Sequence, residues 1–148
     1  MKIMLDAGAK MPTRAHEDDA GYDLYARETQ IVPARESAVF DTGVHIELPK
    51  VYIFAWDGLQ GFKTVGFLKS KSGLNIKHGI TSEGVIDMGY TGSIKVKLFN
   101  HSSYDYKVNA GDKISQLVIL PILTPELKLV DSLKETDRGN KGFGSSGV

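Results

Sequence analysis

GSIKVKLFN, residues 92–100, shows the residue pattern from which the fold class is predicted. Its apolar residues Ile94, Val96 and Leu98 alternate with two lysines. In an extended strand successive side chains point to opposite faces, so this period of two places the apolar residues on one face and the lysines on the other. The stretch therefore predicts a half-buried β-strand.

Stretches with similar strand chemistry recur along the chain, separated by Gly, Pro, Asn and Asp residues. A helix over Lys77–Met88 is disfavoured by Gly79, Gly84 and the β-branched residues between them. Short strands with turns at intervals of about eight to twelve residues are typical of an all-β sandwich or barrel, and we predict that class. The other stretches are TQIVPARESAVF (29–40), GVHIELP (43–49), VYIFAW (51–56), KTVGFLKS (63–70), YKVNAGD (106–112), KISQLVILPIL (113–123) and ELKLVDSL (126–133).

Length, composition and charge exclude several classes of protein. The 148 residues suffice for one domain with a core, and the 18 basic and 18 acidic side chains cancel, so no broad positive field favours nucleic acid or a membrane surface. The chain has no cysteine, no apolar run long enough to span a bilayer and no apolar segment of the kind that marks a secretory signal. We expect a cytoplasmic protein, or an intracellular one if a virus encodes it, with no nucleic-acid or membrane partner.

An aromatic-rich segment, LPKVYIFAWDGLQGFKTVGFL at residues 48–68, contains the single tryptophan, Trp56. Two interpretations stay open. The segment is an extra hairpin whose aromatic residues cluster locally, or it is an insertion that binds a protein partner.

The C-terminal stretch RGNKGFGSSGV, residues 138–148, has too little apolar surface to offset the entropy of ordering. Its glycines match the dinucleotide fingerprint G-x-G-x-x-G, but that fingerprint requires a helix after it and the sequence stops one residue later. Gly and Ser amides can nevertheless wrap phosphate oxygens, Arg138 can pair with a phosphate through two hydrogen bonds, and Phe143 can stack on a flat ring. The stretch is either an unstructured tail or a lid that orders on a ligand.

Four further stretches place polar residues in turns or among apolar ones. An aspartate at the end of the apolar run Val-Ile-Asp, Asp87, is costly to bury unless it is hydrogen-bonded or functional. Taken singly, each stretch is more often structural than functional. They are DDAGYDL (18–24), KSKSGLNIKHGI (69–80), with a Lys-Ser-Gly turn, GVIDMGYTG (84–92), with a tight hairpin, and GDKISQL (111–117).

In this order and spacing, AGYDL, KSGL, GVIDMGYTG, GDKISQL and RGNKGFGSSG closely resemble the five motifs of the trimeric dUTP pyrophosphatase (dUTPase) family. The resemblance covers about residues 3–148, and residues 51–63 look like an insertion. It implies a jelly-roll-like distorted β-barrel, residues 1–137, that forms a homotrimer with a C-terminal arm, the lid 138–148. It also implies hydrolysis of dUTP, with Mg²⁺ on the triphosphate, to dUMP and pyrophosphate, which limits uracil in DNA and supplies dUMP for thymidylate synthesis.

The resemblance assigns the central motif to catalysis and to recognition of the nucleoside. Asp87 is implied to be the base that activates water for in-line attack on the α-phosphorus. Tyr90 is implied to pack on the deoxyribose and to exclude a 2′-hydroxyl. The backbone of Gly84, Val85 and Ile86 is implied to read the uracil edge.

The resemblance assigns other residues to the triphosphate. Lys71, Ser72 and Gly73 correspond to a phosphate-binding motif in which the family more often has Arg-Ser-Gly, so a point charge replaces a forked contact. Gln116 is implied to contact phosphate. Asp23 is implied to lie near the Mg²⁺ shell, through water, which suits an ion that keeps most of its waters.

In the lid, Arg138 is implied to hold the γ-phosphate and Phe143 to stack on uracil. Gly144, Ser145 and Ser146 are implied to donate amides and hydroxyls to the phosphates. In the central motif, Gly89 stands before Tyr90 where the family often has Asp, which loosens one turn contact without affecting the proposed base.

Two rival functions differ in the chemistry they need. A deaminase of the same fold, acting on dCTP, would require a glutamate at the base to shuttle protons. A regulatory binder would use the insertion around Trp56 and would not depend on hydrolysis. None of the four histidines, His16, His45, His78 and His101, has a spacing that suggests a metal triad.

Overall fold

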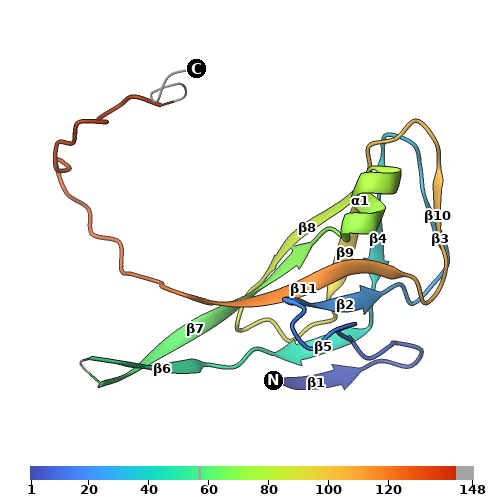
Figure 1. Ribbon diagram of the computed structural model, residues 1–148, viewed down its shortest axis with the longest axis horizontal. Helices are drawn as coiled ribbons and strands as arrows, with labels where there is room; N and C mark the ends of the chain where they lie inside the picture. The colour runs from blue at the N-terminus through green and yellow to red at the C-terminus, as the bar shows by residue number, and fades with distance from the viewer. Residues whose placement is uncertain (57, 143–148) are drawn as a thin grey trace.

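The computed structural model describes residues 1–56 and 58–142 and is built almost entirely of strands (Figure 1). The strands are β1 (Lys2–Leu5), β2 (Gly21–Tyr25), β3 (Gln30–Val32), β4 (Ser37–Asp41), β5 (Val44–Glu47), β6 (Val51–Ala55), β7 (Gly58–Lys69), β8 (Ile80–Ile86), β9 (Lys95–Asn100), β10 (Tyr106–Val108) and β11 (Lys113–Ile122), and the helix is α1 (Ser72–His78). The all-β prediction is confirmed. At seven residues, α1 is far too short to cross a membrane, and it is the one helix in the described part of the chain.

The main sheet is antiparallel and follows the order β2-β11-β7-β8-β9-β4, with β6 paired to the outer half of β7. Two short pairs, β1 with β5 and β3 with β10, complete the curled, jelly-roll-like body. Antiparallel pairing of β2 with β11, which are widely separated in sequence, brings two of the quoted polar stretches, DDAGYDL and GDKISQL, side by side.

The core confirms the alternation from which the fold class was predicted. Val96 and Leu98 on β9, and Ile94 just before it, have no solvent-exposed surface, while Lys95 and Lys97 are exposed. Each fully buried side chain of this size stabilises the fold by about 1.5–3 kcal/mol relative to exposure. These three side chains belong to a single buried apolar cluster that also includes Leu24, from β2.

The predicted Lys-Ser-Gly turn is instead the start of α1. Lys71 is the extended residue before the helix, and Gly79 ends it with a positive φ of 65°. Gly79 adopts that left-handed conformation without the steric cost that a Cβ would impose. The next strand, β8, then begins at Ile80, so residues 80–86 are extended and the disfavoured helix over 77–88 does not form.

The predicted strand ELKLVDSL is wrong. β11 ends at Ile122, and residues 123–142 form no strand and run outward from the sheet (Figure 1). A strand needs a neighbouring strand to satisfy its backbone groups, and no strand of the described chain pairs with this segment. Leu127 and Leu129 are each 99% exposed. The predicted boundary between body and lid, at 137/138, lies inside this extended segment.

The segment around Trp56 is a hairpin, as one of the two interpretations predicted, formed by β6 and the first half of β7. The local aromatic cluster of that interpretation is wrong, because Trp56 is 99% exposed and Phe54 84% exposed. Tyr52 is the exception, since its ring lies directly over Gly61 on the paired strand, where a Cβ would come within 3.0 Å of the ring.

Candidate active site

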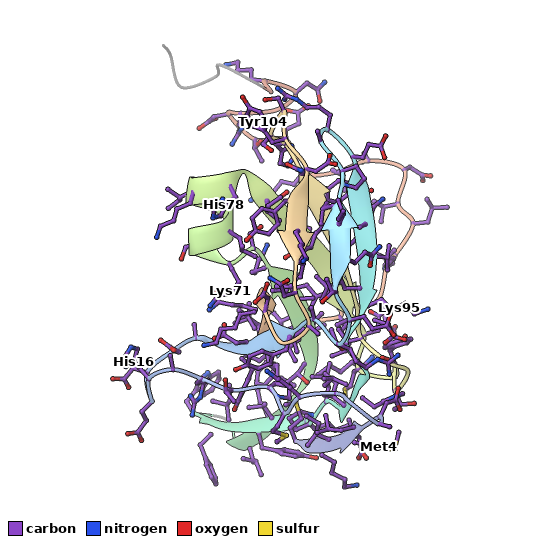
Figure 2. The ribbon with its side chains drawn as sticks, turned by 90° about the vertical axis from the view of Figure 1, so that its right-hand side faces the viewer. Met4, His16, Lys71, His78, Lys95 and Tyr104 are labelled. Carbon is purple, nitrogen blue, oxygen red and sulfur yellow. The ribbon has the colours of Figure 1, made fainter. Side chains whose placement is uncertain are left out.

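A charged cluster lies where β2, β11 and the start of α1 meet. Asp23 on β2 stands opposite Gln116 on β11 in the strand register. The Asp23 side chain is 4% exposed, and its two oxygens are both occupied. Oδ1 accepts from Lys71 Nζ at 2.5 Å and Oδ2 accepts from Lys113 Nζ at 2.8 Å. Figure 2 shows Lys71 beneath α1 and beside β2.

The electrostatics of this cluster favour an anionic ligand. Burial by itself raises the pKa of Asp23, but the hydrogen bonds and positive charges of Lys113 and Lys71 outweigh it and hold the pKa below the usual aspartate value. Asp23 in turn raises the pKa of Lys113. One carboxylate and two ammonium groups leave a net charge of +1, which attracts phosphate oxygens. Sequence reasoning missed Lys113, although it belongs to the quoted stretch GDKISQL and precedes Gln116 on the same strand.

The predicted phosphate-binding residues Ser72 and Gly73 adjoin this cluster at the first turn of α1. Both residues are exposed, and nothing lies within 4 Å of the position a Cβ would take at Gly73. The backbone there is open to a close ligand. The structure therefore brings Asp23, Gln116 and the predicted Lys-Ser-Gly residues into one region.

A second group lies at the other end of β8. Gly84, Val85 and Ile86 end the strand, and a Cβ at Gly84 would come within 2.9 Å of Leu68 Cδ1. The exposed Asp87 follows and accepts, through its backbone oxygen, a 2.9 Å hydrogen bond from the backbone N–H of Tyr90.

The predicted tight hairpin is thus a reverse turn inside a longer connection between β8 and β9. Asp87 lines a cavity together with Lys63 and Ile122. This cavity lies where the C-terminal segment leaves the sheet.

Tyr90 has a defined orientation within this loop. Its hydroxyl donates to the backbone oxygen of Ser93 at 2.9 Å. Its ring lies over Gly92 so closely that a Cβ there would come within 2.6 Å of Tyr90 Oη. Only glycine accommodates the ring in this position. The loop therefore presents a carboxylate and a folded-back aromatic ring together.

One chain does not bring these two groups together. The β7–β8 ladder pairs Gly66 with Ile86 at one end and Lys69 with Glu83 at the other. Asp87 follows the first end and Lys71 the second, a separation of at least three strand residues, roughly 10 Å. In Figure 2, Lys71 and Lys95, the residue that begins β9 after the loop, lie on opposite sides of the molecule.

The predicted lid is a third location. Arg138 belongs to the C-terminal segment that runs away from the sheet (Figure 1), in a short turn where Lys141 N–H donates to the Arg138 backbone oxygen at 2.9 Å. Phe143, Gly144, Ser145 and Ser146 lie outside the described residues.

The residues present fit a cation that arrives with a phosphate ligand better than a resident one. Among residues 1–56 and 58–142, no group of three or more His, Asp or Glu side chains is arranged to hold a metal ion. Both Asp23 oxygens already accept from lysines, so a contact between Asp23 and Mg²⁺ would run through water or follow a rearrangement of those lysines.

Comparisons with known proteins agree with the family resemblance of the sequence motifs. The family model described as dUTPase matches residues 7–147. The deoxyuridine 5′-triphosphate nucleotidohydrolase of Clostridium acetobutylicum is 41% identical over 147 residues, covering 97% of this chain and 93% of that protein.

Two solved phage enzymes share the architecture. The dUTPase of Staphylococcus bacteriophage 80alpha with dUPNHPP superposes with a TM-score of 0.84 at 33% identity, covering 99% of this chain and 98% of that one. A mutant dUTPase from phage phi11 of S. aureus, described with a structural Mg(II) ion, gives a TM-score of 0.75 at 32% identity, covering 88% and 96%.

Proposed function

This chain belongs to the dUTPase family, and we propose that it hydrolyses dUTP to dUMP and pyrophosphate. The observation that carries the proposal is the loop after β8, where the exposed carboxylate of Asp87 and the fixed ring of Tyr90 occur in one turn. In the cell the reaction limits uracil in DNA and supplies dUMP for thymidylate synthesis.

Asp87 is the general base of the proposed reaction. It accepts a proton from a water molecule, whose oxygen bonds to the α-phosphorus as the bond to the β-phosphate oxygen breaks. The electron pair of that bond leaves with pyrophosphate, and dUMP remains. General-base assistance of this kind contributes a rate factor of about 10²–10⁴.

The charged cluster binds the triphosphate. Lys71, Ser72 and Gly73 contact the phosphates, Gln116 adds a side-chain amide, and the net positive charge beside Asp23 favours the anion. Mg²⁺ bound to the triphosphate would supply positive charge that stabilises the leaving group. Asp23 is the residue that would hold this ion, through water.

The nucleoside binds at the loop after β8. Backbone groups of Gly84, Val85 and Ile86 pair with the uracil edge, and a wrong base leaves polar groups unpaired, which is a strong basis for rejection. Tyr90, whose ring is positioned over Gly92, packs on the deoxyribose and excludes a 2′-hydroxyl.

A homotrimer unites the groups that one chain keeps apart. Asp87 and Lys71 lie at opposite ends of the β7–β8 ladder, and the segment that carries Arg138 extends away from its own sheet, as a residue contributed to a neighbouring subunit would. Residues 138–148 close over the bound nucleotide, with Arg138 on the γ-phosphate, Phe143 on uracil, and Gly144, Ser145 and Ser146 on the phosphates. Closure excludes water and aligns the triphosphate.

Pyrophosphate release from dUTP, dTTP, dCTP and UTP, with and without Mg²⁺, tests the proposal. We expect fast release from dUTP with Mg²⁺ and slow release from the other three. Equal rates on all four would refute the assigned base and sugar contacts. Formation of a uracil nucleotide from dCTP would instead identify the deaminase rival.

A second role at the β6–β7 hairpin is favoured by one observation, the nearly complete exposure of Trp56 and Phe54 at its tip. Exposed aromatic side chains of this kind anchor protein interfaces. Capture of a partner by the full chain, and its loss when residues 51–63 are deleted while dUTP turnover is kept, would establish the role. Equal capture by both proteins would refute it.

A further inference from the structure

The imidazole of His45 joins the loop after β8 to the N-terminal strand pair. Nδ1 lies 2.9 Å from the backbone oxygen of Thr91, and Nε2 lies 3.2 Å from Asp6 Oδ1. Thr91 belongs to the loop, and Asp6 directly follows β1. The His45 side chain is 19% exposed. Carbonyl and carboxylate oxygens only accept, so the bond to Thr91 requires a hydrogen on Nδ1 and the bond to Asp6 requires one on Nε2.

The contacts that begin at His45 continue through Asp6 and reach the loop after β8 a second time, at Ser93. Asp6 Oδ2 pairs with Arg27 Nη1 at 3.3 Å, and Arg27 Nη2 pairs with Asp41 Oδ2 at 3.6 Å. The Ser93 hydroxyl donates to Asp41 Oδ1. The hydrogen bond from Ser93 is the main reason that the pKa of Asp41 lies below the usual aspartate value. His45, Asp6, Arg27 and Asp41 therefore form one continuous network of hydrogen bonds and ion pairs, whose two ends bind Thr91 and Ser93.

Between these two anchors lies the support for Tyr90. Gly92 is the residue on which the tyrosine ring rests, and the Ser93 backbone oxygen accepts the tyrosine hydroxyl. If the segment 91–93 shifts, the ring loses both its platform and its hydrogen-bond acceptor. The position of Tyr90 thus depends on contacts made by His45 and Asp41, neither of which belongs to the loop.

We propose that His45 is a positioning residue for sugar recognition. Through its Nδ1 bond to Thr91 it holds the Gly92 platform, and so Tyr90, in the place that accepts deoxyribose and rejects ribose. The inference rests on the proposed function of this same loop. Asp6, Arg27 and Asp41 support His45 and connect it to Ser93, at the other end of the segment 91–93.

Two conservative variants separate the two bonds of the ring. The amide nitrogen of asparagine occupies nearly the position of Nδ1, so His45→Asn keeps a donor for Thr91 and loses the contact with Asp6. The amide nitrogen of glutamine occupies nearly the position of Nε2, so His45→Gln keeps the contact with Asp6 and loses the donor for Thr91. If His45 had only a structural role, the glutamine variant would not be expected to lose more than the asparagine variant.

The test is steady-state hydrolysis of dUTP and UTP by the full-length protein. For His45→Gln we expect the KM for dUTP to rise about 3- to 10-fold, the range of one net hydrogen bond, with kcat changed less than twofold, because sugar packing acts equally before and in the transition state. The preference for dUTP over UTP, as a ratio of kcat/KM, falls by a similar factor. His45→Asn lies closer to the wild type in both quantities.

Hydrogen exchange of the backbone amides of residues 90–94 gives a readout that needs no turnover. We expect faster exchange in His45→Gln than in His45→Asn. Lys2→Met is the matched control, because Lys2 lies on the same β1–β5 pair and its ammonium group donates to the exposed Glu47 at 3.1 Å.

The two proposals fail in different ways. A wild-type protein that does not hydrolyse dUTP refutes the proposed function, whatever the exchange data show. An active wild type with equal dUTP preference and equal amide exchange in the two His45 variants refutes the positioning role alone. An asparagine variant that loses more than the glutamine variant also refutes it.

Discussion

Replacement of Asp23 by asparagine should destabilise the protein through the two lysines that the carboxylate holds. The side chain is 4% exposed and accepts from Lys71 at 2.5 Å and from Lys113 at 2.8 Å. An asparagine offers a single acceptor oxygen without charge, so at least one ammonium loses its partner, and the two positive charges then repel each other. The lysine side chains are 22% and 42% exposed and can turn toward water, which limits the loss.

The expected loss for Asp23→Asn is about 1–3 kcal/mol, below the 3–5 kcal/mol typical of a fully buried broken pair. In a protein of this length that lowers Tm by roughly 3–10 °C. Denaturant unfolding at one fixed protein concentration measures it, because the stability of the proposed homotrimer would depend on concentration. Glu47→Gln, which breaks the exposed pair with Lys2, is the matched control and should cost less than about 0.5 kcal/mol.

The pH dependence supplies a second check on the same pair. Because the pKa of Asp23 is lower in the folded protein than in the unfolded chain, its contribution is fully present above the ordinary aspartate pKa of about 3.9 and is lost as the pH falls through the folded-state value. The stability difference between wild type and Asp23→Asn should therefore shrink between pH 6 and pH 3. A difference below 0.5 kcal/mol at pH 6, or one that does not shrink on acidification, would refute the reasoning.

Four further outcomes are expected. Gly92→Ala should displace the tyrosine ring above it and raise the KM for dUTP about 2- to 10-fold, while Gly89→Ala, where nothing lies within 4 Å of the new methyl, should match the wild type in the same assay; equal KM values would count against the platform. Asp87→Asn should bind dUTP normally, by calorimetry, yet turn over about 10²–10⁴-fold more slowly, and near-normal turnover would rule out this base. A chain truncated after Asp137 should keep its circular dichroism spectrum and Tm but lose most activity, so an unchanged rate would argue against a lid. Lys71→Arg should retain dUTP turnover, since arginine supplies a forked contact to phosphate, and a severe loss would show that the lysine geometry is required.

The features that sequence predicted well are those that depend on local patterns. Alternation of Ile94, Val96 and Leu98 predicted a half-buried strand because the period of side chains along a strand is two whatever the rest of the fold does. The motif stretches around Asp87 and Lys71 were identified because their residue types occur in a characteristic order and spacing.

Prediction failed where the local structure depends on whether another part of the chain pairs or packs with the segment. ELKLVDSL has strand chemistry, but no strand of the described chain pairs with it, so it remains extended and exposed. Ser72–His78 forms a helix that Gly79 ends in a left-handed conformation, and the residue pattern alone did not reveal this short helix. The aromatic residues of the hairpin at Trp56 had no partner surface within the described chain on which to cluster.

The order of residue types thus established the all-β class, the strand faces and the identity of the chemical groups, since each follows from neighbours a few positions away. Only the folded arrangement revealed that Lys113 shares Asp23 with Lys71, that His45 reaches Thr91, and that the proposed base lies apart from the proposed phosphate site. The first two of these relations join residues from 46 to 90 positions apart (His45 to Thr91, and Asp23 to Lys113), and such contacts are set by how the sheet closes rather than by any local preference.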